Sequence, residues 1–284
     1  MKIAAYQAPI PHCGSMESLD LIREQIAWCQ SEGVEILCCP EAILGGLADY
    51  AKRPTDFATN VDGGQLNTVL APLASDTVTT ILGFTEITRD GHLFNSAAVF
   101  HRGSVLGVYR KLHPAIRKSI YRAGEQMPVF QVGDLRFGII ICLDSNYIEP
   151  ARIMASQGAT ALFVPTNNGL PLEQADIELP VQTRNVDIAL AINNTVSVVR
   201  ADVAGRTENL VSYGSSEIVD PDGMVLQSAQ RFSEGLIVAE IDTLPRKFRS
   251  GWNASRNGAV IDEYARLVAR SRNESTIGLK PGRT

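Results

Sequence analysis

The sequence predicts an α/β protein in which helices pack against mixed β-sheets. Helix-like and strand-like segments alternate along the chain. Several strand candidates also follow one another directly, separated by short turn signals such as Asp90-Gly91 and Arg102-Gly103. Hairpins of this kind among βα units favour a sandwich with a mixed sheet over a purely parallel, doubly wound sheet.

The composition is that of a folded globular protein with a sizeable core. The chain has 284 residues, of which 45% are hydrophobic and 20% are charged, and its formal net charge is -5. The apolar fraction excludes a disordered protein, and a chain without excess positive charge is not expected to bind nucleic acid. No apolar run approaches the roughly 20 residues of a membrane span. Because the N-terminus also lacks a signal-peptide pattern, we expect a cytoplasmic protein without membrane contact.

The N-terminal part of the chain has the order strand, helix, strand. Lys2–Gln7 is a short apolar strand candidate, and the mostly apolar Val34–Cys39 is a second one that we expect to be buried on both faces. Between them, Ser15–Gln30 repeats apolar residues at helical spacing. Gly33 is well placed to end this helix.

Strands outnumber helices in the remainder of the chain. The strand candidates are Asp76–Thr85, Ser96–His101, Val105–Arg110, Val129–Val132, Leu135–Cys142, Ala159–Pro165, Ala191–Arg200, Tyr213–Val219, Met224–Ser228 and Leu236–Ile241. The helix candidates are Glu149–Gln157, Leu172–Ala189 and Val260–Ala269. This succession agrees with a mixed-sheet sandwich.

Three reactive residues each follow a predicted strand directly, where rigid scaffolds commonly present catalytic groups. They are Glu41, Lys111 and Cys142. A helix candidate begins a few residues after Cys142, and a thiol near a helix N-terminus has its thiolate form favoured by the dipole. Each residue also has an ordinary structural interpretation: a solvated glutamate, a charged strand end and a small buried side chain.

The cysteines do not form a disulfide or metal pattern. The five of them are Cys13, Cys29, Cys38, Cys39 and Cys142. Their number is odd and no CxxC pair occurs, so neither a disulfide framework nor a zinc ribbon is indicated. A metal site made from His12 and three of these cysteines would lack standard ligand spacing, and ordinary packing explains them better.

Taken together in the order Glu, Lys, Cys, these segments make the sequence resemble the nitrilase, or carbon–nitrogen hydrolase, superfamily. The resemblance extends from about Met1 to Asp242. The family's three motifs match Pro40-Glu41, Tyr109-Arg110-Lys111-Leu112-His113 and Cys142-Leu143-Asp144. Further matches are Gly83, Glu86, Asn95-Ser96-Ala97, Pro165-Thr166-Asn167, Gly214-Ser215-Ser216 and Pro221-Asp222-Gly223.

The resemblance implies a four-layer α-β-β-α sandwich with one hydrolase domain over residues 1–270 and a C-terminal arm at 271–284. It also implies assembly as a homodimer or higher homo-oligomer. In the implied reaction Cys142 is the nucleophile, Glu41 moves protons, and Lys111 stabilises the oxyanion together with the backbone N–H of Leu143. The implied substrate is a small amide or N-carbamoyl compound, and no cofactor or metal is needed because the cysteine supplies the chemistry.

The chain departs from the family at one position. Many members carry a second active-site glutamate between the lysine and the cysteine, whereas this chain has Arg117 there and Glu125 is the nearest acid. Either Glu125 or another acid takes that role, or the site works without it. Arg117, Glu125, Asn146 and Asn167 are therefore candidate substrate-binding residues. Arg117 is a candidate to bind a substrate carboxylate, although a plain surface arginine is the more common case.

Two alternatives to an amidase stay open. One is a catalytically weak binding or scaffold protein that kept the fold, which the missing second glutamate supports and the retained Glu41, Lys111 and Cys142 oppose. The other is a true nitrilase, but nitrilases of the family usually have Trp-Glu directly after the nucleophile, and this chain has Leu143-Asp144. A papain-like pairing of Cys142 with a histidine is disfavoured, because no histidine stands where such a signature places it.

Overall fold

Two β-sheets form the centre of the protein, as seen in a computed structural model that describes residues 1–116, 118–245, 262–263 and 266. Both sheets belong to the first of two units, Met1–Arg246. In the second unit, Lys247–Thr284, the described residues 262–263 and 266 are helical. The predicted arm at 271–284 and most of the predicted helix Val260–Ala269 lie outside the described residues.

The larger sheet has nine strands in the order β5-β4-β3-β2-β1-β11-β12-β9, with β15 also paired to β1. Its strands are β1 (Lys2–Pro9), β2 (Ile36–Cys38), β3 (Thr79–Ile87), β4 (Leu93–His101), β5 (Ser104–Arg110), β9 (Leu170–Pro171), β11 (Val203–Arg206), β12 (Leu210–Tyr213) and β15 (Gly235–Glu240). Strand β1 pairs in parallel with β2 and β11, and β3, β4 and β5 pair as antiparallel hairpins. The sheet is therefore mixed, as the hairpin pattern predicts.

The smaller sheet has six strands in the order β14-β13-β10-β8-β7-β6. Its strands are β6 (Val129–Val132), β7 (Leu135–Ile139), β8 (Ala161–Pro165), β10 (Ser197–Ala201), β13 (Glu217–Val219) and β14 (Val225–Ser228). Strand β8 pairs in parallel with both β7 and β10, whereas the outer pairs are antiparallel.

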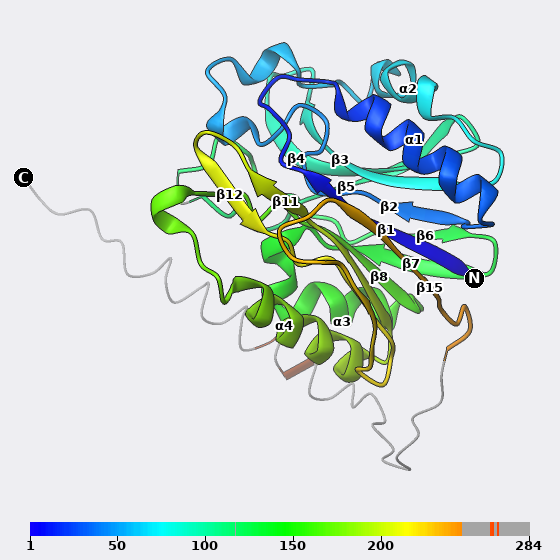
Figure 1. Ribbon diagram of the computed structural model, residues 1–284. Coiled ribbons are helices and arrows are strands. Elements are labelled where there is room, and N and C mark those ends of the chain that lie inside the picture. Colours follow the sequence, from blue (N-terminus) through cyan, green and yellow to red (C-terminus); the bar gives the residue numbers. More distant parts are fainter. Residues whose placement is uncertain (117, 246–261, 264–265, 267–284) are drawn as a thin grey trace, which may run out of the picture. The chain divides into compact units, whose positions relative to one another are not determined.

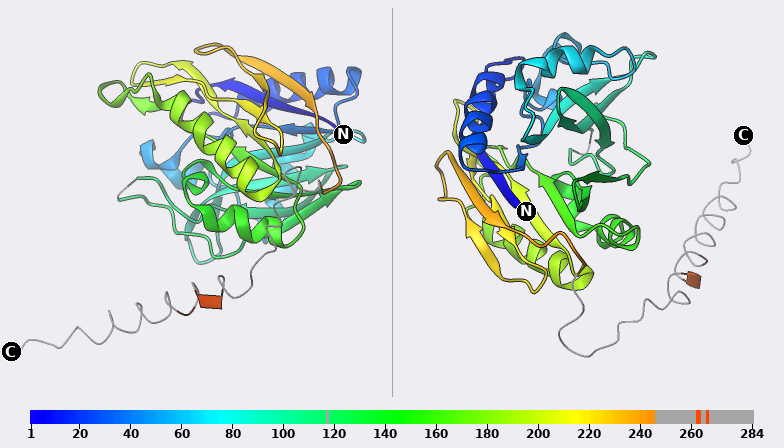
Figure 2. Two further views of the ribbon diagram at one scale, coloured as in Figure 1. Left: turned by 90° about the horizontal axis from the view of Figure 1, so that it is seen from below. Right: turned by 90° about the vertical axis from the view of Figure 1, so that its right-hand side faces the viewer.

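The helices cover the outer faces of the two sheets, which gives the four-layer α-β-β-α sandwich (Figures 1 and 2). They are α1 (Ser18–Ser31), α2 (Gln65–Leu70), α3 (Ile148–Ser156) and α4 (Leu179–Asn194). Alternation along β1 explains the layers: Ala4 and Tyr6 pack in a buried cluster with α1, whereas Ile3 and Ala5 pack between the sheets. Among the described helices, none has the length and apolar character to cross a membrane.

Two predicted elements lie elsewhere than the sequence pattern indicates. The predicted helix Leu172–Ala189 begins only at Leu179, because Pro180 fits the first turn of a helix and would break one that ran through it. The predicted strand Ala191–Arg200 is the end of α4 followed by β10, and Thr195 in a left-handed conformation separates the two. Periodicity alone does not divide an apolar run of this kind.

Candidate active site

Glu41 lies in a buried turn directly after β2, and its carboxylate accepts three hydrogen bonds. Oε1 accepts from Lys111 Nζ at 2.5 Å and from Asn95 Nδ2 at 2.7 Å. Oε2 accepts from the backbone N–H of Asn167 at 2.9 Å. The turn packs tightly against β3, where a Cβ on Gly83 would come within 2.7 Å of the Glu41 Cα. These contacts therefore hold both the backbone and the carboxylate of Glu41 in position.

Lys111 follows β5 and is almost fully buried, with 3% of its surface exposed. Its backbone N–H donates to the Asn95 carbonyl at 2.8 Å, which continues the strand ladder by one residue. Burial acts to lower the pKa of the ammonium, but the opposite charge of Glu41, its hydrogen-bond partner, acts against burial and the pKa is raised. Lys111 is therefore a fixed positive charge beside the Glu41 carboxylate.

Cys142 begins a short 3₁₀ turn, Cys142–Asn146, shortly after β7. Its backbone is left-handed, with φ +47°, and the Ser145 hydroxyl donates to its carbonyl at 2.7 Å. The thiol sulfur lies 3.8 Å from Asn168 Oδ1. This sharp turn presents the side chain of Cys142 to the cavity described below.

The Cys142 thiol differs from the expectation that a helix N-terminus favours its thiolate. Burial and then the negative charge of Glu41 raise its pKa to about 12, although Lys111 and Arg200 act to lower it. The turn that follows is short, so its dipole does not offset these two effects. Both effects favour the thiol over the thiolate, so a base is needed to ionise Cys142.

These side chains meet in one cavity of about 400 Å³. Its polar lining includes Glu41, Asn95, Lys111, Cys142 and Asn167, and a second group of polar residues is Asp49, Tyr50, Tyr121 and Gln174. The apolar lining is Leu47, Pro114, Ala115, Ile116, Leu170 and Pro171. The structure therefore brings together Glu41, Lys111, Cys142 and Asn167 of the residues that the sequence singles out.

Asp144 joins the lysine segment to the cysteine turn. Its carboxylate is fully buried and accepts from the Tyr109 hydroxyl at 2.7 Å, the backbone N–H of His113 at 2.8 Å and the backbone N–H of Ile141 at 3.2 Å. The backbone N–H of Leu112 and the ring of His113 also bond to it. Because these donors flank Lys111 and Cys142, Asp144 holds the two in register.

A buried network of hydrogen bonds and ion pairs holds the cysteine turn in place. Arg200 makes a bidentate ion pair with Asp187 and donates to the Ser145 hydroxyl at 3.0 Å. On the other side, Asp202 accepts from the side chain of Asn168 at 3.1 Å, which leaves Asn168 Oδ1 toward the thiol. Burial raises the pKa of Asp202. This network fixes the groups nearest to Cys142 before any ligand binds.

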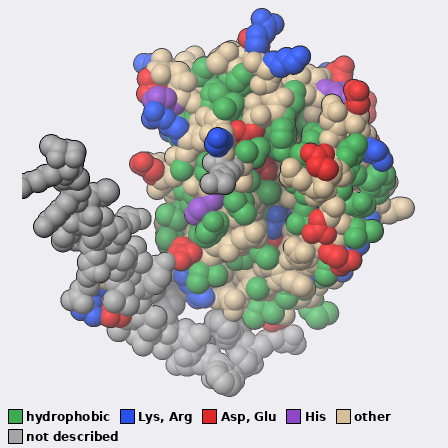
Figure 3. All heavy atoms as spheres, turned by 90° about the vertical axis from the view of Figure 1, so that its left-hand side faces the viewer, with side chains coloured by type: hydrophobic (Ala, Val, Ile, Leu, Met, Phe, Trp, Pro, Cys, Tyr) green, Lys and Arg blue, Asp and Glu red, His purple; other side chains and the backbone are tan. Residues whose placement is uncertain are grey.

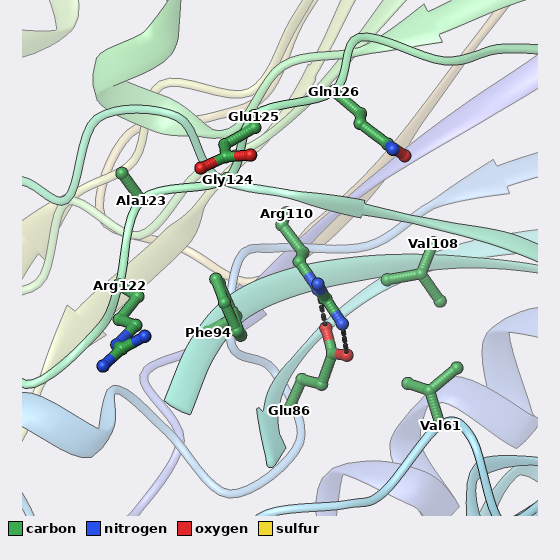
Figure 4. Close-up of a pocket in the computed structure, with 10 residues that line it drawn as sticks. All are labelled: Val61, Glu86, Phe94, Val108, Arg110, Arg122, Ala123, Gly124, Glu125 and Gln126. Atoms are coloured by element: carbon green, nitrogen blue, oxygen red, sulfur yellow. Dashed lines mark hydrogen bonds and ion pairs between the residues drawn. The ribbon is translucent and has the colours of Figure 1, made fainter. Parts of the chain in front are cut away.

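The other candidate residues have different surroundings. Glu125 lines a separate pocket of about 440 Å³ that also contains Arg110, Arg122 and the buried Glu86 (Figure 4). Asn146 is exposed and lines a third pocket, between α3 and α4. Leu143 is half-buried next to Cys142. Arg117 lies outside the described residues.

Sequence reasoning missed the contributions of Asn95, Asp144, Asn168 and Arg200. Asn95 and Asp144 stand inside quoted motifs, so their proximity to the site could have been inferred. Asn168 directly follows the quoted Pro165-Thr166-Asn167 segment, whereas Arg200 carries no local signal, because its partners are distant in sequence. Among the described residues, no group of three or more His, Cys, Asp and Glu side chains could hold a metal ion.

Fold and sequence together define the family of this protein. The carbon–nitrogen hydrolase family model matches residues 2–247, so the chain belongs to that family. A nitrilase of Pyrococcus abyssi is 30% identical over 214 residues, covering 74% of this chain and 78% of the relative. N-carbamoylputrescine amidase of Arabidopsis thaliana is 30% identical over 191 residues, covering 62% and 64%. The solved structure of a mutant Nesterenkonia amidase from the nitrilase superfamily has the same fold, with TM-score 0.74, 23% identity and coverage of 93% and 97%.

Proposed function

We propose that this carbon–nitrogen hydrolase cleaves a small amide or N-carbamoyl substrate through a thioester on Cys142. The observation that carries the proposal is the single cavity lined by Glu41, Lys111 and Cys142, in which Glu41 and Lys111 are hydrogen-bonded to each other. A carboxylate, a fixed cation and a thiol are the three groups that acyl transfer from nitrogen to water requires.

In the first half of the reaction, the Cys142 sulfur attacks the carbonyl carbon and its proton passes to Glu41. Because burial and the Glu41 charge raise the pKa of this thiol, attack by the sulfur requires a base, and Glu41 lines the same cavity. Lys111 and the backbone N–H of Leu143 stabilise the negative oxygen of the tetrahedral intermediate. The carbon–nitrogen bond then breaks, and Glu41 returns the proton to the departing ammonia or amine.

In the second half, water attacks the thioester carbon and gives a proton to Glu41. The carbon–sulfur bond breaks, the carboxylic acid leaves, and the proton on Glu41 returns to the Cys142 sulfur. One water is consumed and one amine and one acid are released, so the site returns to its starting state. Lys111 stays paired with the Glu41 carboxylate and compensates its charge in the buried site.

The test is a panel of small amides, N-carbamoyl amines and nitriles assayed for release of ammonia. We expect turnover of amides or carbamoyl compounds, and its loss in Cys142→Ala. Turnover of nitriles alone would favour a nitrilase, as the name of the Pyrococcus relative suggests. A folded protein that turns over none of these compounds, and whose Cys142 reacts no faster with a thiol reagent than its other cysteines, would favour the binding or scaffold alternative.

We further propose that the protein is a cytoplasmic homodimer acting on small molecules and not on nucleic acid. Helices α3 and α4 both contact the cysteine turn, and both expose apolar side chains, including Ile148 at 68% and Ile192 at 46% exposure. Such a face supports pairing between copies. On the face in Figure 3, acidic and basic side chains are interspersed among hydrophobic ones, which suits small-molecule ligands better than a polyanion. A monomeric mass in light scattering would contradict the dimer.

A further inference from the structure

The cavity around Cys142 contains a second acidic group that the proposed reaction does not use. Asp49 lines the cavity from a short 3₁₀ turn, Ala48–Tyr50, that follows the Glu41 turn in the chain. The hydrogen-bond donors to its carboxylate differ from those to the Glu41 carboxylate. Its Oδ1 accepts from the backbone N–H of Ile120 at 2.9 Å, and its Oδ2 accepts from the Ser119 hydroxyl at 3.0 Å.

The Asp49 turn is held firmly against the segment that carries Ser119 and Ile120. The backbone N–H of Ala48 donates to the Tyr121 hydroxyl at 2.8 Å, and that hydroxyl is also hydrogen-bonded to Thr85 Oγ1 of β3 at 2.8 Å. Each oxygen of the Asp49 carboxylate accepts one hydrogen bond, from Ser119 or from Ile120, and can accept another. The carboxylate is therefore preorganised to accept a further hydrogen bond from a ligand in the cavity.

The charges in the cavity favour a cationic ligand. Glu41 and Lys111 compensate each other as a buried pair, so Asp49 gives the described cavity lining a net negative charge. Asp49 adds to the effect of burial in raising the pKa of Tyr50, and Glu41 acts in the same direction more weakly. The negative charge of Asp49 is therefore felt by a neighbouring side chain of the cavity lining.

The lining of the same cavity also includes apolar side chains, among them Leu47, Ile116 and Leu170. A ligand that fits has a carbon–nitrogen group at Cys142, a short aliphatic chain along this lining and a hydrogen-bond donor at the other end. A protonated amine offers both the donors and the positive charge that a fixed carboxylate binds best.

We propose that Asp49 is a specificity residue that selects substrates whose distal end carries a primary ammonium group. The proposal rests on the proposed amide hydrolysis and deepens it by naming the substrate class. It is opposite in sign to the hypothesis that Arg117 binds a substrate carboxylate, so the two can be separated by one set of matched substrates.

The first experiment compares three acyl chains of similar length that differ in terminal charge. They are δ-aminovaleramide, neutral hexanamide and the monoamide of glutaric acid. We expect the highest kcat/KM for the cationic amide and the lowest for the anionic one. In Asp49→Asn the ratio of cationic to neutral kcat/KM should fall by about tenfold to a hundredfold, as expected for loss of a charge-assisted hydrogen bond.

Two variants serve as controls. Asp49→Glu keeps the charge and should retain part of the cationic preference. Asp56→Asn removes a nearby carboxylate that lies in the Pro54–Asp56 turn and pairs with Arg53, and it should leave the substrate ratio unchanged. Thermal melting of each variant shows whether the turn still folds, because Asp49→Asn also weakens the bonds to Ser119 and Ile120.

A second readout does not depend on turnover. The rate of Cys142 modification is measured with the cationic aminoethyl and the anionic sulfonatoethyl methanethiosulfonates, by mass spectrometry of the peptide that contains Cys142. We expect the cationic reagent to react faster in the wild-type protein, and the ratio of the two rates to drop in Asp49→Asn but not in Asp56→Asn. This comparison reports on charge in the cavity even if no amide is hydrolysed.

The outcomes separate the two proposals. A wild-type preference for neutral or anionic chains, or a cationic preference that survives Asp49→Asn, would overturn the role of Asp49 and leave Cys142-dependent hydrolysis standing. Absence of hydrolysis of every amide and carbamoyl compound would overturn the proposed function. In that case, equal modification ratios in the wild-type protein and in Asp49→Asn would overturn the Asp49 proposal as well.

Discussion

Two carboxylate–cation pairs lie at the end of β5 and contain chain neighbours, yet only one of them faces a thiol. Lys111 pairs with Glu41, and the adjacent Arg110 pairs with Glu86. Successive residues of an extended chain point to opposite faces, which explains why the two pairs line different pockets. Glu41, Lys111 and Glu86 are all nearly inaccessible, whereas 40% of the Arg110 side chain is exposed.

The comparison shows that a buried ion pair is not sufficient for the proposed chemistry. The Glu86 carboxylate accepts two bonds from Arg110 and one from the Ser96 hydroxyl, and Arg110 also stacks on Phe94 (Figure 4). No cysteine is among the residues that line this pocket in the described part of the chain. The Glu41 pair shares its cavity with Cys142 instead. We therefore assign a structural role to the Glu86 pair and expect the following substitutions to separate them.

The largest difference is expected between the two carboxylates. Glu41→Gln removes the proposed base and should lower kcat by about 10²- to 10⁴-fold. Glu86→Gln should leave kcat within about threefold but lower the free energy of unfolding by about 1–3 kcal/mol, since a buried charge-assisted bond is lost. Amide turnover and urea unfolding of both variants measure this. Equal losses of kcat would remove the distinction between the pairs.

The two cations should differ next. Lys111→Gln removes the proposed oxyanion donor and should lower kcat by about 10²- to 10³-fold. Arg110→Gln should change kcat by less than about threefold, because the guanidinium is partly exposed and lies in the other pocket. Steady-state kinetics of the two variants measure these changes in kcat, and circular dichroism shows whether both variants are folded. A loss in Arg110→Gln as large as in Lys111→Gln would contradict the account.

A glycine packs against each of the two ion pairs, so an alanine substitution at either glycine also tests whether the pairs differ in their effect on kcat. A Cβ on Gly83 would lie 2.2 Å from the Ala42 backbone nitrogen, directly after Glu41, and one on Gly124 would lie 2.3 Å from the Arg110 carbonyl oxygen. Both alanine variants should therefore be destabilised, by about 1–3 kcal/mol. We expect kcat of the folded protein to fall by about tenfold or more in Gly83→Ala, and less in Gly124→Ala. Comparable effects on kcat would mean that the Glu41 position is not critical.

The smallest effect is expected in the titration of Cys142. Its pKa is raised to about 12 by burial and then by the Glu41 carboxylate, so the thiolate forms only as the pH rises toward that value. Removing the negative charge in Glu41→Gln should lower this pKa, and Glu86→Gln should leave it unchanged. The rate of alkylation of the Cys142 peptide as a function of pH measures it. A pKa that rises in Glu41→Gln would contradict the electrostatic coupling.

The raised pKa of Cys142 also makes the stability of the fold depend on pH. A thiol whose pKa is higher in the folded than in the unfolded protein stabilises the fold below the unfolded pKa, near 9, and this contribution disappears as the pH rises toward 12. Buried Cys29, with a pKa also raised to about 12, acts in the same direction. Stability of the wild-type protein should therefore decline over this range.

Much of the fold and the centre of the candidate site can be predicted from local sequence. Apolar runs that end in Glu41, Lys111 and Cys142 mark strand ends, and strand ends of a packed sandwich meet in space. The start of α4 is a different case, because the segment 172–189 contains no signal for the first turn of the helix except Pro180. Strands β11 and β12 were not predicted either, although the equally short Val129–Val132 was.

The hydrogen-bonding roles of the supporting residues could not be predicted, even for Asp144 inside a quoted motif, because these roles depend on partners far along the chain. Asp144 accepts bonds from the lysine segment 31 residues earlier, and Asn168 is held by Asp202 and Ser215. Conversely, Glu125 follows the motif segment closely in sequence but lines the pocket of Glu86. Sequence proximity to a motif is therefore not sufficient to place a residue in the cavity, as Glu125 shows.

Trapping the covalent intermediate tests the central claim most directly. The protein is mixed with an amide that it hydrolyses, quenched in acid during turnover, and digested for mass spectrometry. We predict that the acyl group of the substrate is attached to Cys142. The Cys142→Ala variant should carry no such adduct and should have no turnover. An acyl adduct on another residue, or full turnover in Cys142→Ala, would contradict the assignment of Cys142 as the nucleophile.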